Sequence, residues 1–513
     1  MLTSIETQPF LWGVATSAYQ SEGGYNGIDQ PKNNWYESEH KGRVMVTGQA
    51  ADFWTRYEED FKTCQQMGLN SFRIGIEWAR IQPSTVAKRS QAPDFDQQAI
   101  NTYAKIIATC RHYGLEPIVT LHHFTHPAWL GLDAWLSQRT IDHFINFVQV
   151  SITEINRLLI DHYQVSPIHL FITINEPNIL VTNSFLRADF PAKTRGIKAV
   201  LKAYNNILLA HVRAYNSIHN IYQSQGWPTP QVSLNTYCSD LYWLEKVIWD
   251  LLSVKKNQIK LAELKDYFDS QAQDLEISLS KAKLPFRRDL PYYLGRLVRR
   301  AAKSLGYYLF DPKYFKTLLV ELEKSPYPDV FDYLAIDYYD PFIAHTFRLP
   351  FFSDFEFQTK DFRGWLMSGI TSKWWDWRSL PEGLHFFCKY YSEQYKNKPI
   401  LIAENGMALR RKFDNSIATK RPDQMSRSEF IKIHLEQVKR LFDEGVSLMG
   451  YIHWSLTDNY EWGSYTPRFG LFSLDFMEGT KRLEVDHLGD RPSQTYAELI
   501  QKAKQALKNQ DRI

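Results

Sequence analysis

Short apolar stretches recur along the chain, and turn residues or polar positions separate each of them from the next. Eight of these stretches have the length and the β-branched or aromatic content expected of strands. They cover residues 10–18, 71–78, 116–122, 168–175, 231–235, 332–338, 398–404 and 448–454. The hydrophobic pattern therefore predicts eight strands spread over nearly the whole sequence.

Segments with helical periodicity lie between most of these strands. Clear examples are Phe53–Met67, Gln97–Tyr113 and Arg427–Phe442, each followed by a glycine where a helix is expected to end. A strand and then a helix, repeated eight times, predicts a closed parallel (β/α)8 barrel, or TIM barrel. The alternative is an open doubly wound sheet, but no GxGxxG turn follows the first strand and a count of eight favours closure.

The interval between the fifth and sixth predicted strands is unusually long, because 101 residues separate Gln231 from Asp332. Residues 241–310 in this interval are mostly helical in pattern, so we expect one catalytic domain over 1–513 that carries a helical insert. Residues 281–303 of the insert hold eight basic side chains and one acid. A solvated helical face is the ordinary interpretation, and the alternative is an amphipathic edge that touches an anionic membrane surface or a lipid-like substrate.

Composition and charge narrow the function classes. With 44% hydrophobic and 23% charged residues, the 513-residue chain is typical of soluble globular proteins. Its net charge of +3 is too small to attract nucleic acid to the protein as a whole, so we expect no nucleic-acid partner. The four scattered cysteines indicate reduced thiols, and no secretory signal or membrane-spanning run is visible, so we expect a cytoplasmic protein.

The ends of two predicted strands carry carboxylates. Glu176 follows the fourth strand and Glu404 ends the seventh, at the edge where barrel enzymes hold their catalytic groups. Glycosidic bond cleavage needs two carboxyl groups and no metal, because one protonates the leaving oxygen while the other attacks the sugar or activates water. Metal hydrolysis competes, since three histidines lie within 122–126, but no HExxH helix accompanies them. We therefore expect neither metal nor cofactor.

Six segments of the chain resemble the retaining β-glycosidases of glycoside hydrolase family 1, which have this barrel fold. They lie in the family's order at residues 10–23, 72–83, 120–124, 173–177, 402–406 and 454–462, and the resemblance extends from Phe10 to about Ser493 apart from the insert. It implies that Glu176 is the general acid/base and Glu404 the nucleophile that forms a covalent glycosyl-enzyme. Arg73 and Tyr339 would then contact the Glu404 carboxylate.

The same resemblance implies which residues bind the substrate, a small-molecule β-glycoside. Asn175 would bind the sugar 2-hydroxyl, Trp377 would lie on the aglycone side, and Trp454 would form the stacking floor. The remaining hydroxyl partners would be Gln20, His123, Glu461 and Trp462.

Three positions depart from the family pattern. Phe124 stands where many members have tryptophan, which removes an indole N–H donor. Asp337 stands where asparagine is usual, and an added acid that is ionised is expected to raise the pKa of a neighbouring carboxyl, which affects the pH optimum. The loop after Trp462 is one residue shorter than the commonest form, and we place Phe469 of that loop in the site.

Glu461 also bears on the substrate. Relatives that cleave 6-phosphorylated sugars carry serine at this position, with lysine and tyrosine nearby, because a carboxylate would repel a phosphate dianion. We therefore expect a retaining β-glycosidase for unphosphorylated β-D-glucosides, with β-D-galactosides or β-D-fucosides as further substrates. Two alternatives stay open: a transglycosylase for lipid or hydrophobic glycosides, and a non-catalytic carbohydrate-binding relative, although such proteins usually lose one of the two glutamates.

Overall fold

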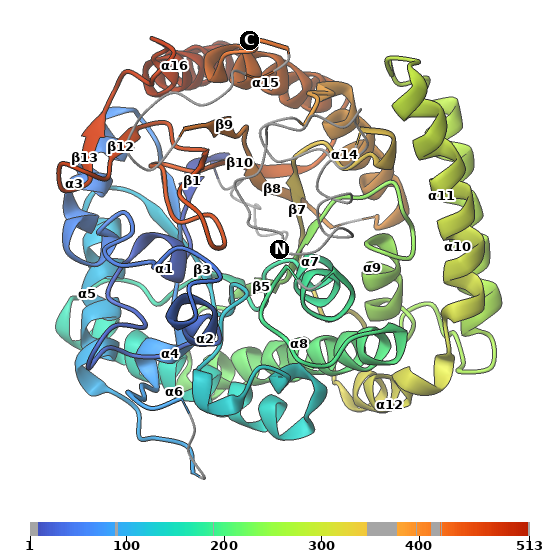
Figure 1. The fold of residues 1–513 in the computed structure, drawn as a ribbon, viewed down its shortest axis with the longest axis horizontal. Coiled ribbons are helices and arrows are strands. Elements are labelled where there is room, and N and C mark those ends of the chain that lie inside the picture. The colour runs from blue at the N-terminus through green and yellow to red at the C-terminus, as the bar shows by residue number, and fades with distance from the viewer. Residues whose placement is uncertain are drawn as a thin grey trace, which may run out of the picture.

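The protein is a closed barrel of eight parallel strands surrounded by helices (Figure 1). The computed structural model describes residues 9–87, 91–187, 189–345, 377–396, 398–411, 421 and 423–510. The barrel strands are β1 (Leu11–Ala15), β2 (Ser71–Gly75), β3 (Glu116–Thr120), β4 (Leu170–Ile172), β5 (Gln231–Ser233) with β6 (Asn235–Tyr237), β7 (Leu334–Tyr338), β8 (Ile400–Asn405) and β10 (Leu448–Trp454). All eight predicted strands are present, so the predicted (β/α)8 fold is confirmed.

Closure of the barrel depends on the fifth strand. The hydrogen-bonded order is β5-β4-β3-β2-β1-β10-β8-β7-β6, and every neighbouring pair in it is parallel. Only Leu234 separates β5 from β6, so these two segments at the ends of the order are one barrel strand. Its first half pairs with β4 and its second half with β7, which joins the two edges.

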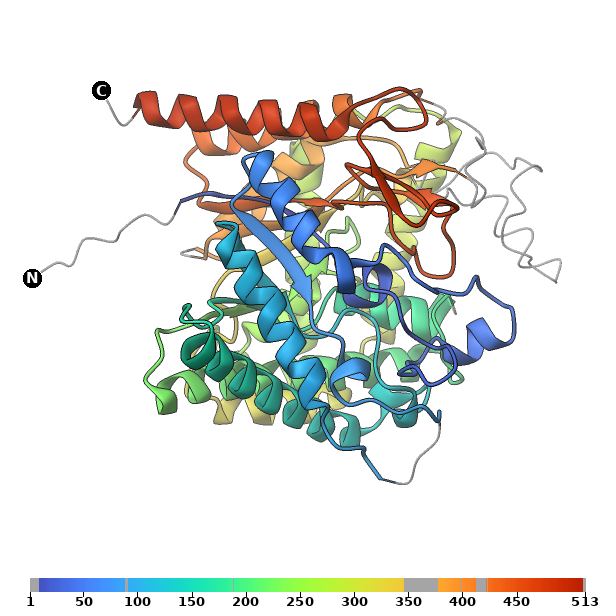
Figure 2. The same cartoon turned by 90° about the vertical axis from the view of Figure 1, so that its left-hand side faces the viewer.

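The larger helices cover the outside of the barrel. They are α3 (Phe53–Gln66), α5 (Gln97–His112), α6 (Gln138–Arg157), α8 (Ile197–Gln225), α12 (Lys316–Lys324), α14 (Pro381–Gln394), α15 (Arg427–Asp443) and α16 (Pro492–Gln510). The three helices predicted from periodicity are α3, α5 and α15, and a glycine with positive φ follows each one, as expected. Figure 2 shows α16 lying along one side of the barrel, where it packs against α15.

Shorter elements occupy the loops. Helices of one or two turns are α1 (Ala18–Ser21), α2 (Tyr36–His40), α4 (Trp78–Ile81), α7 (Pro177–Thr182), η1 (Ala128–Leu130), η2 (Ala134–Leu136), η3 (Leu158–His162), η4 (Asn183–Arg187), η5 (Pro312–Phe315) and η6 (Ile343–His345). Two small antiparallel ladders pair β9 (Leu409–Arg410) with β11 (Pro467–Arg468) and β12 (Ser473–Asp475) with β13 (Lys481–Leu483).

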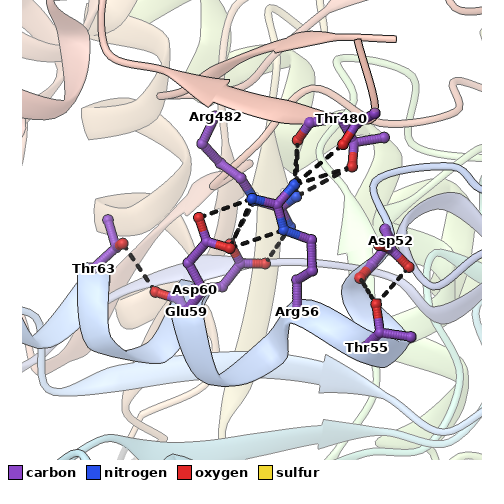
Figure 3. Close-up of polar contacts among 9 residues, drawn as sticks. Asp52, Thr55, Arg56, Glu59, Asp60, Thr63, Thr480 and Arg482 are labelled. Carbon is purple, nitrogen blue, oxygen red and sulfur yellow. Dashed lines mark hydrogen bonds and ion pairs between the residues drawn. The ribbon is translucent and has the colours of Figure 1, made fainter.

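An ion pair holds the β12–β13 hairpin against α3 (Figure 3). Arg482 donates from Nε and Nη2 to the two oxygens of Asp60, both at 2.9 Å, and Asp60 is buried. Arg56 of α3 donates to the Thr480 carbonyl at 2.9 Å. The hairpin is therefore fixed to α3 by a bidentate ion pair between Arg482 and Asp60.

The insert predicted over 241–310 contains three helices between β6 and β7. These are α9 (Lys246–Leu252), α10 (Leu264–Lys281) and α11 (Leu290–Leu309). Figure 1 shows α10 and α11 at one edge of the molecule, outside the helices that wrap the barrel. None of the described helices combines the length and the apolar content needed to cross a membrane.

Candidate active site

The two strand-end glutamates meet at the carboxyl end of the barrel. Glu176 lies between β4 and α7 in left-handed backbone (φ +37°), and Glu404 lies near the end of β8. Their carboxylate oxygens lie within 4.8 Å of each other, and an Asp337 oxygen lies within the same distance of both. A retaining glycosidase holds its carboxyl groups about 5–5.5 Å apart, whereas an inverting one leaves about 6.5–9.5 Å for a water. The spacing therefore suits direct attack by one carboxylate.

The Glu404 carboxylate is held by a cation and a phenol. Arg73 of β2 donates from Nη1 to one oxygen at 2.5 Å, and the Tyr339 hydroxyl donates to the other at 2.8 Å. Burial raises the pKa of Glu404 above its ordinary value, and Arg73 and Tyr339 oppose that rise. Both bonds stabilise the ionised form, which is the form that can attack.

Glu176 is in a different electrostatic environment. Burial raises its pKa well above the ordinary value, and the neighbouring charge of Glu404 raises it further. The Arg73 guanidinium, which also lowers this pKa, bonds directly to Glu404. Two buried glutamates thus differ in their preferred charge, with the proton favoured on Glu176 and the negative charge on Glu404.

Asp337 joins these two groups because of an irregularity in the sheet. The β7–β8 register shifts between Ile336 and Asp337, and the shift places Asp337 opposite Glu404. Asp337 accepts from the Asn235 side chain and shares a hydrogen bond with Glu176. Burial raises the pKa of Asp337 well above its ordinary value, and Glu404 and Glu176 add to the rise.

The hydrogen bond between Asp337 and Glu176 bears on one expectation from the sequence. An ionised Asp337 is expected to raise the pKa of a neighbouring carboxyl, whereas the hydrogen bond that Asp337 shares with Glu176 lowers the pKa of Glu176. A carboxyl that carries a proton donates a hydrogen bond to its neighbour instead of repelling it, so the expected rise applies only to the ionised form of Asp337.

The residues expected to bind sugar surround this carboxyl cluster. The His123 ring stacks on Trp454 and Trp462, with centroids 5.7 and 5.9 Å apart, and burial lowers the pKa of His123 well below its ordinary value. The Trp454 indole donates to Glu461 at 3.2 Å, and burial raises the pKa of Glu461 to about 8. The Gln20 amide donates to Asn459 at 3.2 Å. Imidazole, carboxyl and amide groups, each able to hydrogen-bond a sugar hydroxyl, therefore converge here.

Several buried polar atoms near the carboxyl cluster have no partner among the described residues, and they include Asn175 Nδ2, His123 Nδ1, Asn235 Oδ1 and Asp337 Oδ1. Arg73 and Asn235 both donate to Asn175 Oδ1, at 2.5 and 2.8 Å, and this fixes the amide with its Nδ2 unpaired. Buried polar groups are normally hydrogen-bonded, so these atoms beside two carboxylates suit contact with the hydroxyl groups of a ligand.

Aromatic rings line another part of the site. Trp377 and Phe469 lie 6.3 and 5.9 Å from the Tyr339 ring, and Phe124 lies 4.9 Å from the Trp462 ring. Phe469, which the sequence places in the site, thus packs against the tyrosine that binds Glu404. Phe124 fills its position with a ring that packs on Trp462.

Sequence reasoning missed two residues of the fifth strand. Asn235 donates to both Asn175 and Asp337, and the Tyr237 ring stacks on Tyr339 with centroids 6.3 Å apart. The predicted strand stopped at residue 235, whereas β6 continues to Tyr237. The rule that site residues lie at strand ends points to Asn235 even with the predicted boundary, and the correct boundary would have added Tyr237.

The three neighbouring histidines do not form a common site. His122 packs against Trp135, and His126 contacts the Gly131 carbonyl at 3.0 Å, so both turn away from His123. Within the described ranges, Glu176, Asp337 and Glu404 are the one group of three with metal-ligating spacing, and their contacts are those of a proton-sharing cluster.

Comparisons with known proteins show a family and a shared fold. A family model described as glycosyl hydrolase family 1 matches residues 5–270 and 312–504. The chain is 26% identical to a 6-phospho-beta-galactosidase of Clostridium acetobutylicum over 91% of this chain and 92% of that protein. It is 25% identical to beta-glucosidase A of Thermotoga maritima over 93% and 94%. The solved structure of a Thermotoga maritima beta-glucosidase with castanospermine superimposes with a TM-score of 0.65 at 21% identity, covering 96% of this chain and 98% of that one.

Proposed function

The chain belongs to glycosyl hydrolase family 1 and is an O-glycosyl hydrolase, and from this premise we propose that it is a retaining β-glycosidase for unphosphorylated β-D-glucosides. β-D-Galactosides and β-D-fucosides are proposed as further substrates. The observation that carries the proposal is the pair of buried glutamates within 4.8 Å, of which Glu404 is bonded to Arg73. The pair supplies an acid and a nucleophile at once.

In the first step, a Glu404 oxygen attacks the anomeric carbon while the bond from that carbon to the leaving oxygen breaks. Glu176 gives its proton to the leaving oxygen, so the aglycone departs as a neutral alcohol and Glu176 becomes a carboxylate. The positive charge of Arg73 stabilises Glu404 before attack. Asn175 is placed to bind the sugar 2-hydroxyl, a contact that strengthens in the transition state.

In the second step, water attacks the anomeric carbon and gives a proton to Glu176, and the bond from the sugar to Glu404 breaks. Both carboxyl groups return to their initial protonation states. Two inversions at one carbon retain the β-configuration. His123, Glu461 and Gln20 are proposed to hold the other hydroxyls, with Trp454 under the ring.

The preference for an unphosphorylated sugar rests on the groups around Glu461. A phosphate dianion would need a cation near Glu461. Arg468 follows Glu461 in the chain, but its guanidinium is already bonded to other groups of the protein. Its guanidinium donates to Asp458 at 3.4 Å and to the carbonyls of Tyr465 and Leu474 at 2.6 and 3.2 Å. Family relatives with both kinds of substrate exist, so this preference must be measured.

The test is hydrolysis of nitrophenyl β-glycosides: the glucoside, galactoside, fucoside, mannoside, 6-phosphoglucoside and 6-phosphogalactoside. Proton NMR on the fastest one identifies the anomer released first. We expect the β-anomer first and the highest kcat/KM on an unphosphorylated sugar. An α-anomer released first overturns retention, a faster phosphorylated substrate overturns the sugar preference, and no hydrolysis of any substrate overturns the proposed activity.

A second candidate activity is transglycosylation onto a hydrophobic acceptor. The observation that favours it is the aromatic group formed by Tyr237, Tyr339 and Trp377, whose rings lie 6.3 to 6.4 Å apart beside Glu404. Such a surface binds an apolar alcohol, whose hydroxyl would replace water in the second step. Octyl glycoside formed from a nitrophenyl glycoside and octanol would support this activity, and free sugar alone would exclude it for that acceptor.

A further inference from the structure

Helix α11 turns an apolar side toward solvent, whereas an ordinary surface helix buries its apolar side. Seven of its large apolar side chains are 40% to 77% exposed, and they are Leu290, Tyr293, Leu294, Leu297, Val298, Leu305 and Tyr308. Their spacing of three or four residues places them along one side of the helix, which we call the α11 face. A helix packed on a core normally turns such a stripe inward.

Glycines on the opposite side fix this orientation. A Cβ atom on Gly295 would lie 2.3 Å from the Ala344 Cα atom in η6, and one on Gly306 would lie 2.2 Å from the Trp243 ring. Two such close approaches, about three turns apart, let the helix backbone rest directly on the protein. The Trp243 indole also donates to the Lys303 carbonyl at 3.1 Å. The α11 face is therefore held toward solvent by the packing behind it.

Positive charges border the α11 face. Arg287, Arg288, Arg296 and Arg300 are exposed at the start of α11 and along one flank. The acid in this segment, Asp289, accepts from the Tyr292 amide, pairs with Arg378 at 2.6 Å and lies 3.7 Å from the Arg287 guanidinium. The exposed surface of α11 thus combines apolar side chains with cations, which is the pattern of helices that lie in a membrane interface.

We propose that the α11 face and its flanking arginines dock this protein on the surface of a bilayer that contains anionic lipids. Anionic headgroups match the arginines while the leucines and tyrosines enter the headgroup region. A second copy of the chain is a poorer occupant, because a symmetric contact would bring like charges together. Residues 271–311, which include α11, lie between the two ranges that match the family model, so the family's catalytic fold does not account for this helix.

The contacts of α11 also lead toward the catalytic end of the barrel. Asp289, which caps the helix, pairs with Arg378, the neighbour of Trp377. The Trp377 ring lies 6.3 Å from that of Tyr339, which binds Glu404. The proposed docking surface is thus connected to the aromatic side of the site through a short series of contacts.

The test is co-sedimentation of the full-length protein with vesicles, which needs no substrate and is independent of the proposed activity. Pure phosphatidylcholine is compared with the same lipid containing about 30% phosphatidylglycerol, at about 50 mM and about 500 mM salt. We expect at least about tenfold stronger binding to the anionic vesicles at low salt and loss of that binding at high salt.

Two variants and a control locate the contact. L294D/L297D should weaken binding at least about tenfold through the lost apolar area, and R296E/R300E should remove the preference for anionic lipid. Met477, which is 62% exposed in the β12–β13 turn, supplies the control M477D, which should bind as the native protein does. Thermal midpoints check folding. As a further readout, L297C labelled with an environment-sensitive fluorophore should shift to the blue on anionic vesicles; the four native cysteines are buried.

Several results would overturn the proposal. One is no binding of the native protein to anionic vesicles at low salt, and another is equal binding to neutral vesicles. Equal losses in M477D and L294D/L297D would show that the α11 face is not the contact. Lipid-independent self-association that L294D/L297D abolishes would assign the face to a second copy.

Discussion

At the residue scale, a single cation, Arg73, makes two otherwise similar carboxyl groups prefer different charge states. Glu176 and Glu404 are both almost fully buried and lie within 4.8 Å of each other. Arg73 bonds to Glu404, while Glu176 shares a hydrogen bond with Asp337. Burial without a bonded cation favours the protonated carboxyl, and burial with one favours the carboxylate. The division of roles follows from this asymmetry.

This division predicts different behaviour for two isosteric variants. Glu404→Gln should abolish nearly all turnover on every substrate, because no nucleophile remains. Glu176→Gln should lower kcat/KM by about 10²–10⁴ on substrates with poor leaving groups, the usual contribution of a general acid. Its loss should be far smaller for a dinitrophenyl glycoside, whose leaving group needs no proton. Equal losses in both variants across leaving groups would contradict these roles.

Asp337 should influence the alkaline side of the pH profile. Its hydrogen bond lowers the pKa of Glu176, so the weaker amide donor in Asp337→Asn should let that pKa rise. Because the acid must be protonated, activity should then persist to higher pH, by up to about one unit. The measurement is kcat/KM from pH 5 to 10 on a substrate with a poor leaving group. A shift of the alkaline limb to lower pH would mean that Asp337 is ionised in the active enzyme.

At the element scale, hydrophobic periodicity predicted the strands and helices well, because a barrel strand is a short apolar run between polar turns. Periodicity could not predict the break at Leu234 or the register shift before Asp337, because the pairing with neighbouring strands sets both. Tyr237 was missed because the predicted strand ended two residues too early, and the contacts of Asn235 with Asn175 and Asp337 depend on this pairing of the strands. Periodicity also indicated that α11 is amphipathic, but which side faces the protein is decided by the close approach at Gly295 and Gly306.

The hairpin contact in Figure 3 allows a prediction at this scale. Arg482→Met leaves the Asp60 carboxylate buried without its partner, which should cost about 3–5 kcal/mol in the free energy of unfolding. A lower urea midpoint would report the loss. The control is D60N/R482M, in which no charge is left unpaired and much of the stability should return. A single variant as stable as the native protein would show that this ion pair contributes little.

At the scale of the whole molecule, net charge and local charge carry different information. The chain's +3 gives little general attraction to anionic surfaces, yet 281–303 concentrates positive charge beside the α11 face. We therefore expect the protein to bind anionic surfaces through residues 281–303. Its catalytic site, by contrast, is built from buried groups that bulk salt screens weakly.

The two features together predict a substrate-dependent effect of salt, provided that both the glycosidase activity and the docking surface exist. Hydrolysis of dodecyl β-D-glucoside in anionic vesicles should be faster than in neutral ones at about 50 mM salt and should lose that advantage near 1 M, where the Debye length falls to about 3 Å. Hydrolysis of the soluble nitrophenyl glucoside should change little over the same range. L294D/L297D should remove the advantage on vesicles while its kcat/KM on the soluble substrate stays native, because the α11 face does not touch the reacting atoms. Salt dependence of equal size for both substrates would instead place the effect inside the catalytic site and separate the activity from any membrane surface.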